Sequence, residues 1–299
     1  MNNADSQYQD LADRIMHMGN DKSDRTGTGT LSLFGEHLRF DLTEGFPILT
    51  SKRVHFKSVI GELLWFLSGS TSAKELREKY GVTIWDEWQD ASGELGPVYG
   101  KQWRDFGGVD QIKQSIHTLR TNPDSRRILV SAWNAGELDK MALMPCHVMF
   151  QFYTRPLSWQ ERMQVASNQL KKSDYYFINF THEDFDSAGI AKYKLSCHLY
   201  QRSCDVALGL PFNIASYAAL THMIAAQCNM VPNVLHMSFG DVHIYKNHLK
   251  TLRHQLLRHT YALPTLELLP ADDIFSYKLE DFKLNNYKHS GTAKYDVAV

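Results

Sequence analysis

The sequence feature that most constrains the fold is the stretch QRSCDVALGLPFNIASY at residues 201–217. The residues before it, 193–200, alternate in polarity and predict a strand, whereas apolar residues from Ile214 to Cys228 recur at helical spacing. Between strand and helix lies a Gly-Leu-Pro turn flanked by polar side chains, where the first N–H groups of the helix lack partners. Such junctions bind anions and small polar ligands, although an ordinary helix cap with solvated charges accounts for the pattern equally well.

The composition narrows the class of protein. The chain has 299 residues and a formal net charge of −1, so basic residues must act locally and DNA is not an expected partner. Its four cysteines include no CxxC pair, which argues against zinc and thioredoxin-like chemistry. The N-terminus is polar and no apolar run is long enough for a membrane span, so we expect neither a signal peptide nor a membrane segment. We therefore expect a cytoplasmic protein with free thiols.

The hydrophobic periodicity predicts an α+β fold with one substantial mixed sheet. The alternation at 31–40 changes phase at Gly35, which indicates a bulge or a sharp bend in a strand. Residues 156–190 are polar and irregular, with YYFINF at 175–180 as their apolar part. Helices are predicted at 5–19, 55–67, 109–119, up to Cys228 and from about His243, and strands at 31–40, 128–133, 147–153, 193–200 and 234–239.

One carboxylate is predicted to lie in apolar surroundings. Glu62 comes three residues after Val59 and four before Phe66, on the apolar face of the helix at 55–67. Burial of a carboxylate costs free energy unless it is hydrogen-bonded, and burial raises its pKa. Glu62 is therefore either a satisfied structural residue or part of a proton relay.

Three arginines are candidates for binding an anion. Arg25 lies in a Gly- and Thr-rich loop, where the backbone can approach a ligand and a guanidinium can bind phosphate. Arg126 and Arg127 lead into a predicted strand. Adjacent side chains of an extended segment point to opposite sides, so one small anion in the same subunit would rarely use both.

Aromatic residues and one cysteine complete the candidates. Trp85 and Trp88 are three residues apart, a spacing that suits either core packing or the walls of a site for a flat heterocycle. Tyr99 follows Gly96 closely and precedes another glycine, which predicts a ring open to a cleft. Cys146 begins a predicted strand, and Arg202 on the next strand would favour its thiolate if the two strands pair. A Cys–His hydrolase is disfavoured because no oxyanion-hole motif accompanies the cysteine.

Several long motifs, in order, resemble the thymidylate synthase family over most of the chain. The resemblance implies a single catalytic domain over residues 1–299, with a large mixed β-sheet flanked by helices and one sheet face forming a homodimer interface. The motifs are DRTGTGTLSLFG at 24–35, HFKSVIGELLWFL at 55–67, TIWDEW at 83–88, GPVYGKQWR at 96–104, DSRRILVSAWN at 124–134, MPCH at 144–147, the stretch at 201–217 and GDVHIYKNHL at 240–249.

The resemblance implies a methyltransferase that converts dUMP to dTMP. Cys146 would add to C6 of the uracil ring, and C5 would then attack the methylene carbon of 5,10-methylenetetrahydrofolate. That folate is both carbon donor and reductant and leaves as dihydrofolate, so no metal, flavin or nicotinamide is needed. Arg126 and Arg127 would reach across the dimer interface to the phosphate bound by the neighbouring subunit.

The resemblance also assigns a role to each matched residue. The catalytic set is Cys146, Glu62, Tyr99, Arg202, Asn213 and Asp205. The dUMP set is Arg25, Arg126, Arg127, Arg202, Ser203, Asp205, Asn213, His243 and Tyr245. The folate set is His55, Glu62, Ile84, Trp85, Trp88, Asp205, Gly209, Phe212 and Val299. The Asn213 amide matches uracil, but a flipped amide would match cytosine, so this residue alone does not exclude dCMP.

The chain departs from the family pattern at residues 156–190. The family commonly joins these two strands by a short turn, so we expect a surface insertion here, of unknown role. Two other functions stay open. A pyrimidine deoxynucleotide hydroxymethylase of the same fold is disfavoured by Asn213 and Trp85, and a non-catalytic nucleotide- or RNA-binding protein is disfavoured by Cys146 and Arg202.

Overall fold

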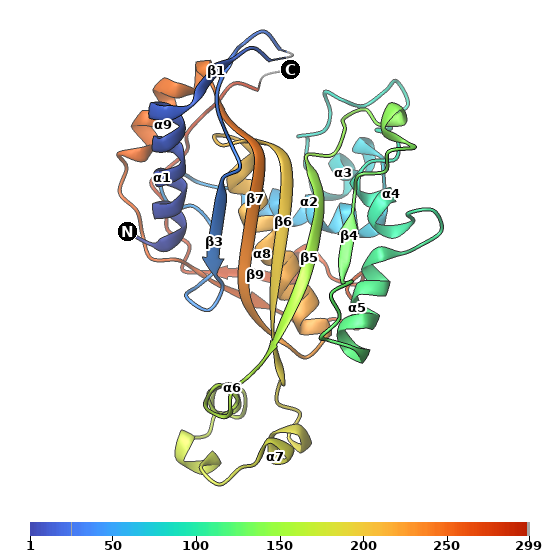
Figure 1. Ribbon diagram of the computed structural model, residues 1–299, viewed down its shortest axis with the longest axis vertical. Helices are drawn as coiled ribbons and strands as arrows, with labels where there is room; N and C mark the ends of the chain where they lie inside the picture. The colour runs from blue at the N-terminus through green and yellow to red at the C-terminus, as the bar shows by residue number, and fades with distance from the viewer. Residues whose placement is uncertain (25, 298–299) are drawn as a thin grey trace.

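The computed structural model describes residues 1–24 and 26–297. In this part of the chain seven strands form one sheet in the order β1-β2-β7-β6-β5-β4, with β3 also paired to β7 (Figure 1). Only β6 and β7 run parallel, so the sheet is mixed, as predicted. The strands are β1 (Asn20–Lys22), β2 (Thr30–Phe34), β3 (His37–Asp41), β4 (Leu129–Ser131), β5 (His147–Pro156), β6 (Tyr193–Asp205) and β7 (Val231–Tyr245), and β8 (Thr265–Leu268) and β9 (Phe282–Asn285) form a separate pair.

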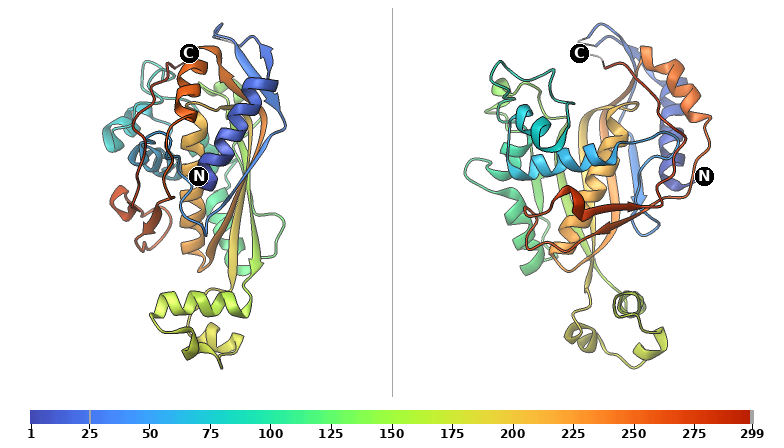
Figure 2. Two further views of the ribbon diagram at one scale, coloured as in Figure 1. Left: turned by 90° about the vertical axis from the view of Figure 1, so that its left-hand side faces the viewer. Right: turned by 180° about the vertical axis from the view of Figure 1, so that it is seen from behind.

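Helices cover one face of this sheet. Helix α8 is buried on nearly all sides, because it packs between β6 and β7 and the apolar helix α2. Figure 2 shows both helices on the same side of the sheet. Among the described residues no helix is long and apolar enough to span a membrane. The α-helices are α1 (Asn3–Met18), α2 (Phe56–Ser68), α3 (Ala73–Tyr80), α4 (Tyr99–Arg104), α5 (Gln111–Thr121), α6 (Trp159–Leu170), α7 (His182–Ser187), α8 (Gly209–Gln227) and α9 (Leu249–Leu256).

The predicted bend at Gly35 is confirmed. Strands β2 and β3 both pair with β7, and Gly35 between them has a φ of 85°, in the left-handed region that favours glycine. Its N–H donates to the carbonyls of Phe239 and Gly240, both at 3.1 Å. The glycine therefore lets one extended segment turn while it stays attached to a single partner strand.

Two local predictions were wrong. Residues near His243 do not begin a helix, because β7 continues to Tyr245 and α9 starts only at Leu249. Arg126 and Arg127 lie in a turn before β4 rather than in an extended segment, and both side chains are exposed. Short-range periodicity could not locate either boundary, because pairing with distant strands decides where a strand ends.

The other face of the sheet carries no helix of the described chain (Figures 1 and 2). His198 and His236 on this face are exposed, whereas their chain neighbours on β6 and β7 are buried. The register places one row of residues across this face, from β4 through β5, β6 and β7 to β3: Leu129, Gln151, His198, His236 and Arg39.

Residues 157–192 form a small helical lobe beyond the ends of β5 and β6 (Figure 1). The lobe contains α6 and α7, so it is more regular than its sequence suggested. It has its own apolar cluster, which includes Phe177 and Phe185. The buried Arg162 joins its helices by bonds to the carboxylate of Asp186 at 2.7 Å and to the carbonyl of Ile190 at 2.9 Å. The lobe is thus held together largely by its own contacts.

Candidate active site

Cys146 lies directly before β5, beside the strand that carries Arg202. The antiparallel pairing of β5 and β6 lets the Arg202 N–H donate to the Cys146 carbonyl at 2.9 Å. The Arg202 guanidinium donates to the carbonyls of Pro145 and Met144, both at 2.9 Å. The pKa of the Cys146 thiol is nevertheless raised, because burial outweighs the opposing charge of Arg202. The predicted pairing of the two strands is confirmed, and Arg202 does favour the thiolate as expected, although burial has the larger effect on the pKa of Cys146.

Tyr99 is buried against the cysteine rather than open to a cleft. Its ring is only 4% exposed, because it packs against Phe66 and His147 at the start of α4. Its hydroxyl accepts the N–H of Cys146 at 2.8 Å and the N–H of His147 at 3.3 Å. Burial, and then the nearby Cys146, raise the pKa of Tyr99, so the phenol stays protonated at neutral pH. The two glycines around it did not predict this packing.

Glu62 lies on the buried face of α2, as its helical position predicted. The indole N–H of Trp85 donates to its Oε1 at 2.7 Å. Burial raises the pKa of Glu62 to about 7, and the bond from Trp85 opposes this only in part. The expected rise is confirmed, and at neutral pH both protonation states are populated.

The amide of Asn213 is held by a residue that sequence reasoning missed. Gln201 on β6 donates from Nε2 to the Asn213 Oδ1 at 3.0 Å, in the buried first turns of α8. His147 also faces this amide, and burial lowers the pKa of His147 to about 4, so the ring is neutral. The sequence did indicate that the side chain of Gln201 points to the opposite side from that of Arg202, because the two residues are adjacent on a strand.

The parallel pairing of β6 and β7 joins two of the sequence motifs. Ser203 is opposite Asp241, and Asp205 is opposite His243. The Nδ1 of His243 lies 3.0 Å from Oδ1 of Asp241, and this contact, with others, holds the pKa of that carboxyl far below its usual range. The ring of Tyr245 stands nearly perpendicular to that of His243, with centroids 5.2 Å apart. Hydroxyl, carboxylate and imidazole groups from the two motifs thus converge where these strands end.

Asp205 links this area to the C-terminal segment. His248 donates from Nε2 to the Asp296 carbonyl at 2.7 Å, and its Nδ1 is 3.9 Å from Asp205. The ammonium of Lys52 lies 5.0 Å from the Tyr295 ring, and burial lowers the pKa of Lys52 to about 8. Sequence reasoning missed Lys52 and His248, although both stand in or beside the quoted motifs.

The folate residues of the sequence analysis are only partly brought together. Trp85 and Trp88 pack edge-to-face with centroids 6.1 Å apart. Ile84 is 43% exposed, and His55 is exposed and bonded to a neighbouring serine. Gly209 begins α8 within reach of Asn213, since an added Cβ would lie 3.6 Å from its Oδ1, and the half-buried Phe212 follows on that helix.

Four of the predicted ligand residues are exposed or lie outside the described part of the chain. Arg126 and Arg127 are exposed and make no described side-chain contact with the residues around Cys146. Arg25 and Val299 lie outside the described residues. Of the residues predicted to bind the phosphate, only Arg202 and Ser203 are therefore placed near Cys146 by the described part of the chain.

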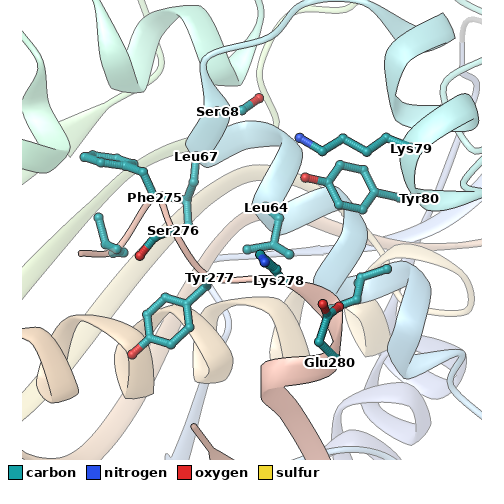
Figure 3. A pocket seen from close by; sticks show the side chains of 12 residues that line it. Leu64, Leu67, Ser68, Lys79, Tyr80, Phe275, Ser276, Tyr277, Lys278 and Glu280 are labelled. Carbon is teal, nitrogen blue, oxygen red and sulfur yellow. The ribbon is translucent and has the colours of Figure 1, made fainter. Parts of the chain in front are cut away.

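A separate hollow of about 410 Å³ lies between α2 and residues 274–280 (Figure 3). Lys79, Tyr80 and Lys278 are among its lining residues, and none of the candidate site residues lines it. Within residues 1–24 and 26–297, no group of three or more His, Cys, Asp or Glu is placed to hold a metal ion.

Comparison with known proteins agrees with the motifs. The family model described as "Thymidylate synthase" matches residues 6–299. A curated relative described as "Thymidylate synthase", from Buchnera aphidicola subsp. Schizaphis graminum (strain Sg), is 48% identical over 299 residues. That match covers 98% of this chain and 99% of the relative. The chain therefore belongs to the thymidylate synthase family.

Proposed function

We propose that the protein methylates dUMP to dTMP through a covalent bond between the Cys146 sulfur and C6 of the uracil ring. The observation that carries this proposal is the grouping of Cys146 with Tyr99 and Arg202, beside the Glu62 carboxyl whose pKa is about 7. A thiol bonded to C6 makes C5 nucleophilic and places charge on O4, so a nearby proton donor is required.

The residues around the thiol each support one part of this step. Arg202 stabilises the Cys146 thiolate when it forms, because its charge already lowers the pKa of that thiol against burial. Glu62 exchanges a proton with O4 through water, since a group of pKa near 7 both gives and accepts protons at neutral pH. Tyr99 fixes the backbone of Cys146 and orients the water that removes the C5 proton.

Asn213 selects the base. With Gln201 bonded to its Oδ1, the amide presents oxygen to N3–H and its NH₂ to O4, which is the pattern of uracil. Ser203, His243 and Tyr245 hold the phosphate and the ribose hydroxyl, together with Arg25.

The co-substrate is 5,10-methylenetetrahydrofolate, which supplies the carbon and the hydride and leaves as dihydrofolate. The half-buried Trp88 and the exposed Ile84 would offer it an apolar wall, and Asp205 would offer a carboxylate to the pterin edge. Trp85 forms the inner part of the wall, with Gly209 and Phe212 beside Asp205. His55 at the rim and Val299 at the chain end complete the folate contacts.

We further propose that the active unit is a homodimer. The uncovered sheet face exposes Met149 and Tyr153, at 39% and 69%, as an interface between two copies would require. Arg126 and Arg127 are exposed. Each would bind the phosphate in the neighbouring subunit's site, in addition to Arg202 of that subunit. Residues 1–299 would form one catalytic domain, with 156–190 as a surface insertion. The protein would act in the cytoplasm, where its four thiols stay reduced.

The activity is tested by mixing the protein with 5,10-methylenetetrahydrofolate and either dUMP or dCMP and following dihydrofolate by absorbance. We expect a rise with dUMP only. Hydroxymethylated nucleotide without dihydrofolate, detected by mass spectrometry, would replace this proposal by hydroxymethylation, and dUMP binding without any product would replace it by a binding role.

The shared site is tested by mixing two inactive variants. Arg126→Glu removes a cation lent to the neighbour, and Cys146→Ser removes a nucleophile used in its own subunit. Mixed dimers should regain activity, because one of the two sites then has both residues intact. If mixed dimers form and no activity returns, the two residues act within one subunit.

A further inference from the structure

A cluster of basic side chains lies on the uncovered sheet face, away from Cys146. His37 and Arg39 come from β3, His198 from β6 and His236 from β7, and they line a hollow of about 480 Å³. Ser238 and the neutral Gln7 of α1 line it as well, and none of its lining residues carries a carboxylate. The mechanism proposed above uses none of these groups.

Two of the imidazoles share one hydroxyl. The Oγ of Ser238 lies 2.9 Å from Nδ1 of His37 and 2.7 Å from Nε2 of His198. A hydroxyl has one proton to donate, so the neutral arrangement has one imidazole accepting and the other donating. Protonation of both rings leaves the Ser238 proton without its acceptor and places two cations on one oxygen.

The nearby charges do not compensate for protonation. The carboxylate of Glu36 pairs with Arg14 at 2.5 Å, and the carboxylate of Asp41 accepts bonds from Thr43. The side chains of β5 next to His198 are neutral, since its register partner there is Gln151.

His198 and His236 also lie close to like charges. The centroids of His198 and His236 are 6.1 Å apart, and Arg39 is the register partner of His236 on β3. Burial, and then His37, lower the pKa of His198, whereas burial, Arg39 and His198 lower that of His236. Arg39 therefore carries the permanent positive charge of the cluster, and protonation of His198 and His236 in acid adds to it.

We propose that this cluster makes the pairing of two copies through the sheet face depend on pH, with the pair favoured while the imidazoles are neutral. The proposal rests on the homodimer proposed above. The occupant is a second copy because the same row of residues continues from His236 and His198 to the exposed Leu129, an uncovered surface that a symmetric partner would bury.

The direction of the effect follows from proton linkage. Covering the cluster removes water from the imidazoles, so their pKa values fall further in the pair than in the free subunit. The free subunits then bind more protons, and the pair weakens as the pH falls through the lowered pKa values of His198 and His236. Each coupled proton raises the dissociation constant by up to about tenfold per pH unit below the pKa of the free subunit.

The test is fluorescence-detected sedimentation of the full chain at pH 8 and pH 5.5, over nanomolar to micromolar concentrations. We expect the dimer dissociation constant to rise at least about tenfold in acid. The double variant His198→Gln with His236→Gln should lose most of this dependence. His254→Gln, which changes an exposed histidine of α9, is the matched control and should keep it.

A second variant tests the same idea without acid. His198→Lys carries a permanent charge, so its dimer should be at least about tenfold weaker at pH 8, with circular dichroism confirming the fold. Equal dissociation constants at both pH values and in His198→Lys would overturn the pH dependence and leave the homodimer standing. A native chain that is monomeric at pH 8 throughout the range would overturn both proposals.

Discussion

The two ends of the strand pair β5 and β6 differ in what holds them. At one end Cys146 donates its N–H to Tyr99 of α4, which in turn lies near Glu62 of α2, and both helices are distant in the sequence. At the other end the same strands lead into the lobe at 157–192, where Arg162 and the apolar cluster bind residues of the lobe itself. One end is built by tertiary contacts and the other by local ones.

This difference has a chemical consequence. Near Cys146, burial raises the pKa values of the thiol, of Tyr99 and of Glu62, and for Glu62 this costs stability at neutral pH because the unfolded carboxyl would be ionised. In the lobe the charged groups are paired and the pKa of Asp186 is lowered by Lys192 and Arg162, which stabilises the fold. Mutations at the two ends should therefore separate activity from stability.

Cys146→Ser should have the largest effect on activity. Because serine is a far weaker nucleophile near neutral pH, we expect kcat to fall by about 10³-fold or more, while the dissociation constant for dUMP changes little. Steady-state kinetics and calorimetric titration with dUMP measure both. Cys228→Ser is the control and should leave kcat within about threefold. Substantial turnover by Cys146→Ser would contradict the covalent step.

Arg162→Ala should cause the largest loss of stability, confined to the lobe. It leaves the carbonyl of Ile190 without its buried donor, whereas the part-exposed Asp186 keeps Lys192, so we expect local destabilisation of about 1–3 kcal/mol. Hydrogen exchange of α6 and α7 should accelerate while kcat is unchanged. The control Arg155→Ala breaks a more exposed ion pair with Glu161 and should cost at most about 1 kcal/mol. A parallel loss of kcat would show that the two ends are coupled.

Glu62→Gln should stabilise the protein while slowing it. The carboxyl has an ordinary pKa of 4.5 when unfolded and about 7 when folded, so the folded state holds the extra proton between these values. Stability therefore falls as pH rises from 4.5 to 7, by about 3 kcal/mol in all. Denaturant unfolding should show the variant more stable than the native protein at pH 8 and equal to it at pH 4. The same difference at both pH values would show that Glu62 is not the titrating group.

Replacing residues 158–191 by Asn-Gly should have the smallest effect on activity. The pairing of β5 and β6 already extends to Leu157, because its N–H donates to the carbonyl of Lys192 at 2.8 Å. A two-residue hairpin turn therefore fits between these two residues. We expect kcat within about threefold of the native value in a folded, dimeric protein. A large loss of kcat with the fold and the dimer intact would give the lobe a role in the site.

Parts of this architecture could be predicted from the sequence. Helical spacing alone placed Glu62 on an apolar face, and a change of phase located the bend at Gly35. The position of Arg202 next to Cys146 was expected from pairing of their strands. These features succeed because each depends on local periodicity or on neighbouring strands.

Other parts depended on contacts between distant residues. Nothing in the glycines around Tyr99 indicated that its ring would be buried against His147, or that its hydroxyl would hold the backbone of Cys146. The bond from Gln201 to Asn213 needs the exact placement of α8 on β6. The turn at Arg126 and Arg127 likewise follows from the position of β4 at the sheet edge.

The sequence by itself determined which chemical groups are present, the mixed α+β class and the family. Only the tertiary structure decided their electrostatics: whether burial or Arg202 controls the pKa of Cys146, and how far that of Glu62 rises. The physical reason is that desolvation depends on every atom packed around a charge, most of which belong to distant parts of the chain.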